Sequence, residues 1–456
     1  MPRLTMFVLG AGFIAGCGDN LAPSNFPTID CTKVNATHCV EVHGGDSAGL
    51  LTVANSIDAN TTIVLGAGTF AMTNQLTLRT TGAHLIGQGV DLTTLDFGPT
   101  TTQGNGVDAV GDDFLIQDLT VRDAAKDGIR VEASKGVVFR RIHATWSKPS
   151  DPNNGGYGIY PVKSQNVLVE GSSAENASDA GLYVGQCQHV IVRNNTVTGN
   201  VAGLEIENTE YADVYGNTAE DNTGGIVVFD LPGNPIVGRD VRLRDNVIRN
   251  NNHVNFASGG TVDGIPSGTG TFAMASRRVE ITGNTYQNNN TGDIALISGL
   301  ALEPDVTKWT LPMAMLSGTY TDLGLLPGGA PNTIMNFRGE NIVVAHNKHM
   351  GSGTMPDAFD PLHIGQLLIL AYQGHPVDNV LYDAIGESEF DSTDATKNTN
   401  VNHMCVGGNP GGTFASLALA LQSATSQVPF FRPAAPFAPF DCTALAGGPV
   451  ADVILP

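Results

Sequence analysis

A repeat of 22 residues in the middle of the chain constrains the fold more than any other feature. A glycine followed by Leu or Ile recurs at Gly181, Gly203 and Gly225. A second apolar run follows within each unit and ends in an asparagine, Asn195 in one unit and Asn217 in the next. A fixed period of this length, with short β-branched runs, is typical of a solenoid.

The apolar runs favour strands over helices. They are short, alternate with a period of two, and are bounded by Gly, Asn, Asp and Thr. One unit is too short to bury its own apolar face, but stacked parallel units would share a core and pair their backbone groups. The sequence therefore predicts an all-β fold, a right-handed parallel β-helix. A leucine-rich horseshoe is disfavoured because its Leu-x-x-Leu-x-Leu frame is missing.

The repeat can be followed outward from this central block. Related steps occur at Gly106, Gly128, Gly158, Gly270 and Asp293, and asparagine again closes the second run at Asn246, Asn284 and Asn347. Asparagine tolerates a left-handed backbone, and its amide can bond to the same residue of the next coil. We therefore expect an internal asparagine ladder at one turn.

The overall charge excludes one class of partner. The chain has 456 residues, a formal net charge of −21 and no basic cluster. Nucleic-acid binding needs Lys and Arg side chains to neutralise phosphates. We therefore expect no nucleic-acid partner.

The N-terminus has the features of an export signal. Arg3 precedes a short apolar core, and the segment ends in Phe-Ile-Ala-Gly before Cys17, which is similar to a bacterial lipobox. This predicts a lipoprotein signal peptide over residues 1–16, cleavage before Cys17, and lipid on its sulfur. The alternative is an ordinary secretory signal in which Cys17 is incidental. No other apolar run reaches the ~20 residues of a membrane span.

The mature chain divides into three parts. Residues 17–62 are expected to be a tether and an N-terminal cap, with a short amphipathic helix near 49–57 over the open end of the first coil. The coils then occupy 63–350, and 351–456 form a C-terminal capping or wrapping region. Three loop insertions interrupt the coils, at 146–157, 230–268 and 301–337. Loops of this length are usually functional or capping.

The cysteines also indicate export. Cys31 and Cys39 are plausible disulfide partners, as are Cys405 and Cys442, in an oxidising envelope compartment. Cys187 lies between two strands and is expected to be a reduced turn or core residue. No Cys-x-x-Cys or tight His/Cys cluster suggests zinc, and His346 and His349 are interpreted as surface residues.

Aligning the coils on Gly-[Ile/Leu]-x-[Val/Ile] separates inward from outward positions. The inward positions are Ile129, Ile159, Leu182, Leu204 and Ile226, followed by Val131, Pro161, Val184, Ile206 and Val228. The intervening outward position holds Asp108, Arg130, Tyr160, Tyr183, Glu205 and Val227, and the next holds Glu132, Val162, Gly185, Glu207 and Phe229. We expect these outward residues to form a solvent-facing stripe with two stacked tyrosines.

This stripe is the candidate binding site. Tyr160 and Tyr183 offer apolar ring faces to sugar C–H groups, and Arg130 or Lys163 could hold a uronic carboxylate. Glu205 and Glu207 could act as acid and base, or take part in a calcium site; no other cofactor is predicted.

Asp230 leaves the same face one coil later and is either a further candidate or a turn-former. The alternative for the whole stripe is that polar and aromatic residues stand there for solubility and ladder stacking.

Longer segments resemble a known bacterial family. The block from Gly181 to Pro235, with VAGLEIEN, ADVYGN and TGGIVVFDLPGNP, resembles exported parallel β-helix repeat lipoproteins, and so do VLYDAIGE (380–387), NHMCVGGNPGGTFASL (402–417) and PFDCTALAGGPVADVILP (439–456). The resemblance implies this fold and a place in the cell envelope as an outer-membrane lipoprotein; it implies no activity. More distantly, the coils look like the pectin-lyase-like superfamily, which includes pectate lyases, polygalacturonases and mannuronan epimerases.

Two functions from different classes remain. The first is binding of an envelope or extracellular polysaccharide, with modification by a lyase or epimerase as its enzymatic version. In that version Arg130 or Lys163 neutralises a uronate, and a Tyr or Glu acts as base. The catalytic residues stay unassigned, because the Asp-Pro-His-Asp signature of mannuronan epimerases is missing. The second is a non-enzymatic scaffold at the membrane that contacts a partner protein.

Overall fold

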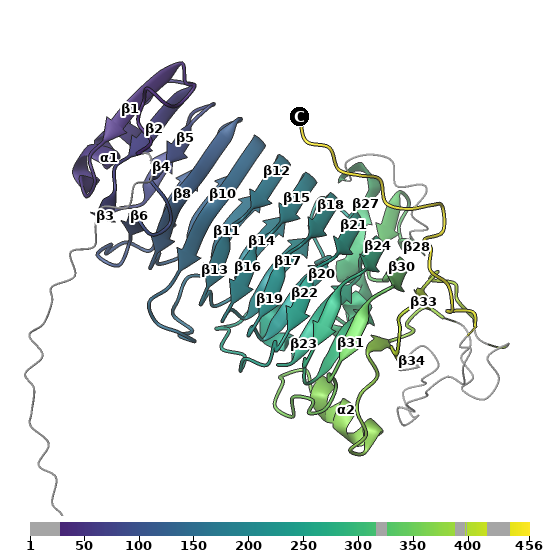
Figure 1. Ribbon diagram of the computed structural model, residues 1–456. Helices are drawn as coiled ribbons and strands as arrows, with labels where there is room; N and C mark the ends of the chain where they lie inside the picture. Colours follow the sequence, from purple (N-terminus) through teal and green to yellow (C-terminus); the bar gives the residue numbers. More distant parts are fainter. Residues whose placement is uncertain (1–27, 316–325, 388–396, 398, 417–437) are drawn as a thin grey trace, which may run out of the picture.

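The chain winds into a long stack of parallel coils (Figure 1). The computed structural model describes residues 28–315, 326–387, 397, 399–416 and 438–456. The predicted signal peptide and Cys17 lie outside these residues, as do parts of 301–337 and of the C-terminal region. No helix among the described residues is long and apolar enough to cross a membrane.

Each regular coil contributes a strand to each of three faces, and neighbouring coils pair in parallel. The first face contains β1 (His38–Val42), β2 (Thr61–Leu65), β5 (His84–Ile86), β12 (Gln165–Glu170), β15 (Gln188–Arg193), β18 (Glu210–Tyr215), β21 (Arg239–Arg244), β24 (Arg277–Thr282), β30 (Glu340–Ala345) and β33 (Cys405–Gly407). The second face contains β3 (Gly68–Ala71), β6 (Thr93–Asp96), β13 (Ser173–Glu175), β16 (Thr196–Thr198), β19 (Thr218–Glu220), β22 (Val247–Arg249), β25 (Thr285–Gln287) and β31 (Lys348–Met350). Two long strands, β8 (Phe114–Arg122) and β10 (Lys135–Thr145), bend across the corner and belong to both of these faces.

The third face is a separate sheet of 11 strands. It contains β4 (Leu76–Leu78), β7 (Val107–Ala109), β9 (Ile129–Glu132), β11 (Tyr157–Val162), β14 (Ala180–Gly185), β17 (Ala202–Glu207), β20 (Gly224–Phe229), β23 (Thr269–Met274), β26 (Gly292–Ile297), β32 (Val380–Tyr382) and β34 (Phe414–Ser416). The described strands extend beyond the expected range of 63–350 at both ends, because β1 already pairs with β2, and β32, β33 and β34 continue the faces after residue 350.

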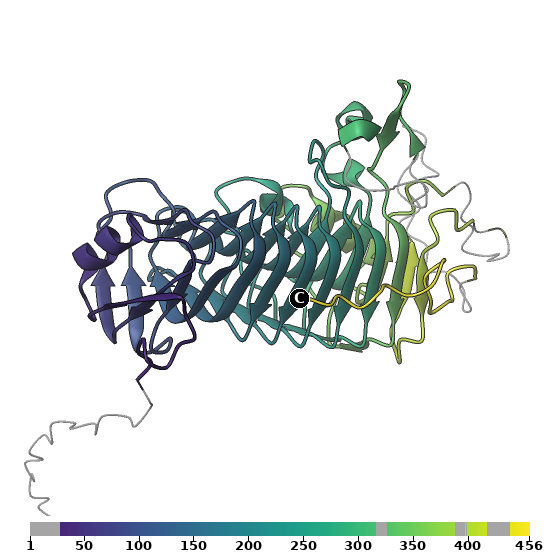
Figure 2. The ribbon, with the colours of Figure 1, turned by 90° about the horizontal axis from the view of Figure 1, so that it is seen from above.

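Shorter elements lie outside the coils. Helix α1 (Ser47–Ala54) contacts β1 and β4 at the N-terminal end, close to the helix predicted there, and the Asp46 side chain caps its first turn. Helix α2 (Ile364–Tyr372) lies near the C-terminal end. Between β26 and β30 a small antiparallel sheet of β27 (Thr310–Pro312), β28 (Leu326–Pro327) and β29 (Thr333–Met335) projects from the stack (Figure 2). Single 3-10 turns occupy Thr261–Gly264, Gly299–Ala301, Val306–Trp309 and Met313–Met315.

The core is a continuous column of apolar side chains inside the coils. The predicted inward positions Ile129, Ile159, Leu182, Leu204 and Ile226 are at most 1% exposed. They lie in register from one coil to the next. The alignment of the repeats is therefore confirmed at the positions that build the core.

The predicted asparagine ladder is present where the chain turns from the first face to the second. The Nδ2 atoms of Asn195, Asn217, Asn246 and Asn284 each donate to the Oδ1 of the asparagine one coil further on, at 2.9–3.1 Å. Asn347 continues the series to Asn409. Each of these six asparagines donates to the next coil, accepts from the preceding coil, or does both. The ladder thereby satisfies polar groups that burial would otherwise leave unpaired.

A second ladder, not predicted from the sequence, runs along the next turn. Asn200 donates to Asn222, Asn222 to Asn251, and Asn251 to Asn289, at 3.0–3.2 Å. Residues beside these turns adopt left-handed backbone in coil after coil, for example Asn194, Gly216 and Gly283. Glycine and asparagine reach this conformation at low cost, which explains why these residue types mark the repeat.

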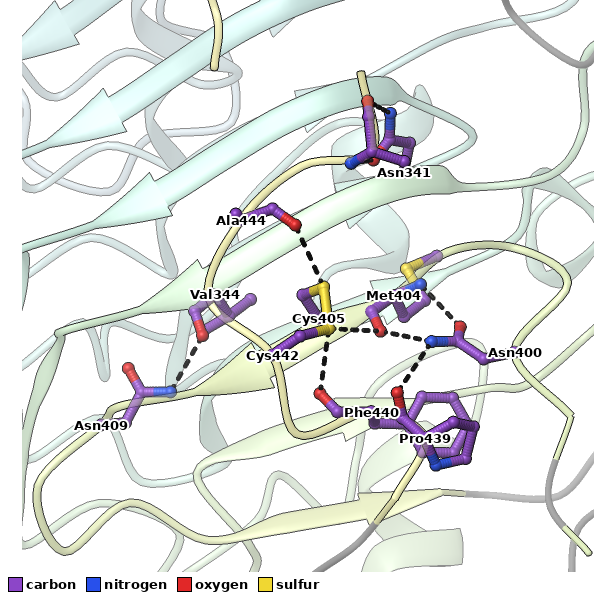
Figure 3. The surroundings of a disulfide bond; sticks show 11 residues. Asn341, Val344, Asn400, Met404, Cys405, Asn409, Pro439, Phe440, Cys442 and Ala444 are labelled. Carbon is purple, nitrogen blue, oxygen red and sulfur yellow. Dashed lines mark hydrogen bonds between the residues drawn. A yellow bond between two sulfur atoms is a disulfide. The ribbon is translucent and has the colours of Figure 1, made fainter. Parts of the chain in front are cut away.

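Both predicted disulfides are present, and Cys187 is a buried free thiol as expected. The Cys405–Cys442 bond joins β33 to the C-terminal segment 438–456, beside Asn400, which bonds to Met404 O and Pro439 O (Figure 3). From there the segment runs back along the outside of earlier coils (Figure 2). Arg278, Asn341 and Arg242 hold it through Ala446, Gly448 and Asp452.

Candidate functional site

The predicted stripe runs across β7, β9, β11, β14, β17 and β20 of the third face. Four of these strands, β11, β14, β17 and β20, are labelled in Figure 1. Arg130 pairs in register with Tyr160, and Tyr183 with Glu205. The ring centroids of Tyr160 and Tyr183 are 4.8 Å apart, edge to face. The sequence alignment therefore brought the correct residues together in space.

A third tyrosine completes the cluster. Tyr157, at the start of β11, lies 4.6 Å from Tyr160 and 4.4 Å from Tyr183 between ring centroids. Tyr157 and Tyr160 are half-buried, whereas Tyr183 is 4% exposed. The cluster thus leaves two rings partly exposed to solvent and packs them on a buried third ring.

Much of the stripe is buried, which contradicts the expected solvent exposure. Glu205 is 1% and Glu207 5% exposed, and Val227 and Phe229 are 2% exposed. The reason is tertiary: residues of the 230–268 insertion and of the segment around Trp309 fold back over the third face and pack against it, among them Val262 and Ile265. A position that points away from the core of a solenoid is solvent-facing only where no loop covers it.

Asp230 is not part of an exposed site either. It is fully buried, and its carboxylate accepts the backbone N–H of Gly238 at 2.9 Å. Burial raises its pKa to about 7. The hydrogen bond from Gly238 to Asp230 closes the loop that follows β20. This contact matches the interpretation of Asp230 as a turn-former and not the interpretation as a binding residue.

Four carboxyl groups surround the tyrosines: Asp127, Asp179, Glu205 and Glu207. Oδ2 of Asp127 and Oε1 of Glu205 are buried without a hydrogen-bond partner. Glu207, in contrast, accepts hydrogen bonds from the Tyr183 hydroxyl, from Gln186 Nε2 at 2.6 Å and from Asn234 Nδ2 at 2.7 Å.

Burial raises the pKa values of all four carboxyl groups. The pKa of Asp127 rises to about 6 and that of Asp179 to about 7, with loss of solvation as the largest cause in both. The pKa of Glu205 lies well above its usual range because of burial and the neighbouring charges of Asp179 and Glu207, and that of Glu207 is also raised by burial. Asp127 and Asp179 can therefore donate as well as accept protons near neutral pH.

The two predicted cations are held by the protein's own carboxylates. Arg130 donates to Asp108 at 3.3 Å and also contacts Glu132, and its guanidinium lies 6.0 Å from the Tyr160 ring centroid. The amino group of Lys163 lies 3.4 Å from Glu132. A uronate would therefore compete with Asp108 and Glu132 for these cations.

Sequence reasoning missed Asp127 and Asp179 as members of the site. Asp127 occupies, one coil earlier, the position of Tyr157, directly before the Gly128-Ile129 step, so the alignment contained the signal for it. Asp179 stands one residue before that position in the next coil. No group of three or more His, Cys, Asp or Glu in the described residues is arranged to hold a metal ion.

One histidine is placed differently from the prediction. His346 is exposed, as expected, but the His349 side chain is only 1% exposed. Its Nδ1 lies 2.8 Å from Asp293 Oδ2, and its ring stacks on Tyr286. The interpretation of His349 as a surface residue is wrong, because β31 turns this side chain toward the buried end of the second asparagine ladder, where Asn289 also bonds Asp293.

The stacked coils and the ladders define the class of protein, a parallel β-helix. Residues 105–304 match the family model described as "Right handed beta helix region". The predicted fold is thereby confirmed as a right-handed parallel β-helix, the fold also found in the pectin-lyase-like superfamily. No curated protein sequence matches the chain.

Several solved structures are similar to the chain at low sequence identity. The A-module of mannuronan C-5 epimerase AlgE4 from Azotobacter vinelandii is 14% identical, with a TM-score of 0.48 over 83% of this chain and 94% of that one. An alginate lyase from Paenibacillus sp. is 16% identical, with a TM-score of 0.42 over 57% and 91% of the two chains. A polygalacturonase from Erwinia carotovora is 10% identical, with a TM-score of 0.40 over 70% and 93%.

Proposed function

We propose that the protein binds a polysaccharide on the outer side of its third face, at Tyr157, Tyr160 and Tyr183. The observation that supports this most is the contact of three tyrosine rings beside carboxyl groups whose pKa values are raised by burial. Sugar rings stack their C–H faces on aromatic rings, and their hydroxyls pair with neighbouring polar groups. The half-buried rings of Tyr157 and Tyr160 provide the contact surface.

The raised pKa values suit a ligand rich in hydroxyl groups. A protonated carboxyl can donate to a sugar hydroxyl and also accept from one. The same property provides acid and base groups for an enzymatic version of the function. A lyase or epimerase would additionally need Arg130 or Lys163 to leave Asp108 and Glu132, so binding without that exchange is the simpler proposal. Calcium remains an expectation that a titration of the same preparation can test.

The test is a glycan-array screen of the chain from residue 18 onward, with and without added calcium. Tyr160→Ala is expected to weaken binding to the best glycan about tenfold, since stacking on one ring contributes about 1–1.5 kcal/mol. The double variant Tyr160→Ala/Tyr183→Ala should abolish it. Tyr215→Ala is the matched control, because Tyr215 lies on the first face under Arg244.

Each outcome of the screen is informative. Loss of binding in the site variants alone, with unchanged circular dichroism, supports the third face as the site. Equal binding by Tyr160→Ala and wild type would place any glycan site elsewhere. No binding of any glycan by folded wild-type protein would leave the scaffold as the better function.

The scaffold alternative has one specific observation in its favour. Large apolar side chains are exposed around α2 and the loops beside it: Val254 is 77%, Met355 67%, Phe359 92% and Leu370 74% exposed. Exposed apolar groups in proximity often mark protein contacts. Co-purification of one partner that Phe359→Ser/Leu370→Ser loses, while folding is retained, would support it.

We further propose export and anchoring through lipid on Cys17. The two disulfides support an oxidising compartment. A full-length chain with Cys17→Ser should move from the membrane fraction to the soluble fraction of cells. An unchanged membrane fraction would contradict the anchor and leave export by an ordinary signal.

A further inference from the structure

A polar cavity of about 620 Å³ lies at the corner where coils enter the first face, at coils that follow the aromatic cluster in the sequence. Its inner wall is formed by Arg239 at the start of β21 and by Arg277 and Arg278 at the start of β24. The C-terminal segment, including Ala446 and Ala451, forms the outer wall. Figure 2 shows this segment crossing the coils.

Arg277 is the unusual member of the cavity. It is 1% exposed, and its Nη1 makes two long bonds to backbone oxygens, Ala275 O at 3.2 Å and Asn336 O at 3.4 Å. Its Nε is buried without a partner. Within the described residues no carboxylate forms a salt bridge with it. A buried guanidinium without a paired anion is costly.

The other two arginines are paired. Arg239 Nε donates to Asp240 Oδ2 at 2.6 Å, and Arg278 Nε to Asp240 Oδ1 at 2.8 Å. Arg278 also donates to Ala446 O and Gly448 O, which fixes the outer wall. One carboxylate, Asp240, is thus shared by two guanidinium groups.

The charge of the wall has a definite sign. Three arginines and two carboxyl groups, Asp240 and Glu340, line the cavity, so their formal sum is 3 − 2 = +1. Glu340 is in addition 3.5 Å from Arg338. Burial lowers the pKa of Arg277 to about 10, although Asp230 and Glu340 oppose the shift, so the group remains cationic near neutral pH.

We propose that this cavity binds a small monocarboxylic acid, whose carboxylate accepts a hydrogen bond from Nη2 of Arg277. A hydrogen bond between a guanidinium N–H and a carboxylate is strengthened by the opposite charges of the two groups. A single negative charge balances the excess charge of the wall, and the volume suits a molecule of the size of a sugar acid. The proposal does not depend on glycan binding at the third face.

The test is isothermal titration calorimetry with full-length protein lacking only the signal peptide. Acetate, lactate and glucuronate are the probes, glucose is the uncharged control for glucuronate, and sulfate and phosphate test other oxyanions. We expect saturable binding of glucuronate and none of glucose. Arg277→Gln should weaken glucuronate binding at least about tenfold, as loss of a charged hydrogen-bond partner does.

Two further variants keep the test decisive. Arg249→Gln is the matched control, because Arg249 pairs with Glu220 on the second face and carries the same charge change. Ala451→Trp fills the cavity from its outer wall without altering an arginine, and should also lose binding if Arg277→Gln fails to fold. No binding of any of the three acids, or binding that both cavity variants retain, would overturn the proposal. Tighter binding of sulfate or phosphate than of every carboxylate would overturn the choice of ligand.

Discussion

The Tyr183 hydroxyl donates a hydrogen bond to Oε2 of Glu207, although the two residues are 24 positions apart. Stacking of adjacent coils creates this contact. Glu205, two residues before Glu207 on the same strand, has a buried oxygen without a hydrogen-bond partner. Hydrogen bonds favour the ionised form of a carboxyl group and burial disfavours it, so the two glutamates differ in their affinity for a proton.

Replacing Tyr183 by Phe should raise the pKa of Glu207 further. The variant keeps the ring but removes one of three donors, so the pKa of Glu207 should rise further above its usual range. A carboxyl ¹³C NMR titration of Glu207 measures this directly. Tyr215→Phe is the control, and an unchanged Glu207 titration in Tyr183→Phe would show that the bond does not favour the charged form.

The buried carboxyls should make the protein less stable as the pH rises from about 4 to about 7. The pKa values of Asp127 and Asp179 in the folded state, about 6 and about 7, exceed the unfolded value of 3.8. The folded state therefore binds more protons in this window, and the stabilisation present below the unfolded pKa is lost as pH rises through the folded pKa. Melting temperatures measured between pH 4 and 8 should fall accordingly.

Asp127→Asn should remove part of this pH dependence. Asp127 is 2% exposed, so the amide avoids the cost of a buried charge and should stabilise the protein at pH 8 by about 2–3 kcal/mol. Asp221→Asn is the matched control, since the Asp221 side chain is 62% exposed. Parallel curves for Asp127→Asn and wild type would contradict the raised pKa.

A substitution in the middle of the asparagine ladder should lower the free energy of unfolding. Asn217→Ala leaves the backbone N–H of Asn195 without its acceptor. It also removes one of the two bonds of Asn195 Nδ2, which keeps its bond to Val169 O, and the bond from Asn217 Nδ2 to Asn246. We expect a loss of about 3 kcal/mol of unfolding free energy, since each unsatisfied buried group costs about 1–3 kcal/mol. Urea unfolding measures it, with Asn153→Ala in an exposed loop as the control. A loss below about 1 kcal/mol would show that water replaces the ladder.

Opening the Cys405–Cys442 disulfide should release the C-terminal segment first. The bond closes a loop with a sequence separation of 37, whose closure contributes at most about 4 kcal/mol in the chain-entropy model. In Cys405→Ser/Cys442→Ser, limited proteolysis should cut within 438–456 while the coils persist. The Cys31–Cys39 pair is the control, since its loss should expose the N-terminal end instead.

The fold could be predicted because its determinants recur at a fixed local spacing. The steps at Gly181 and Gly203 fix which residues point inward, and Asn195 and Asn217 fix one turn. The same spacing relates Asn200 to Asn222, so the second ladder could also have been predicted from the sequence. The burial of Glu205 could not be predicted in the same way, because it depends on a loop that returns from the 230–268 insertion. The spacing of residues within a coil carries no information about that loop.

The site was only partly predictable for the same reason. Register placed Tyr160 beside Tyr183, and this was correct. The pairing of Arg130 with Asp108 follows from register as well. The structure adds that the two side chains form an ion pair, so a uronate would have to compete with Asp108 for Arg130. The arginine cavity joins Arg278 to Gly448, 170 residues away, a separation that no repeat encodes.

The C-terminal segment has a consequence for the order in which the molecule is completed. Arg242 bonds to Asp452, 210 residues later. Coils of a solenoid depend only on their neighbours and can form as synthesis proceeds. Residues 438–456 emerge after all of them, yet they close the wall of a cavity built on coils made much earlier. A chain interrupted before residue 438 would therefore have the strands of the coils and still lack that wall, so an intact arginine cavity indicates that residues 438–456 have been made and have docked.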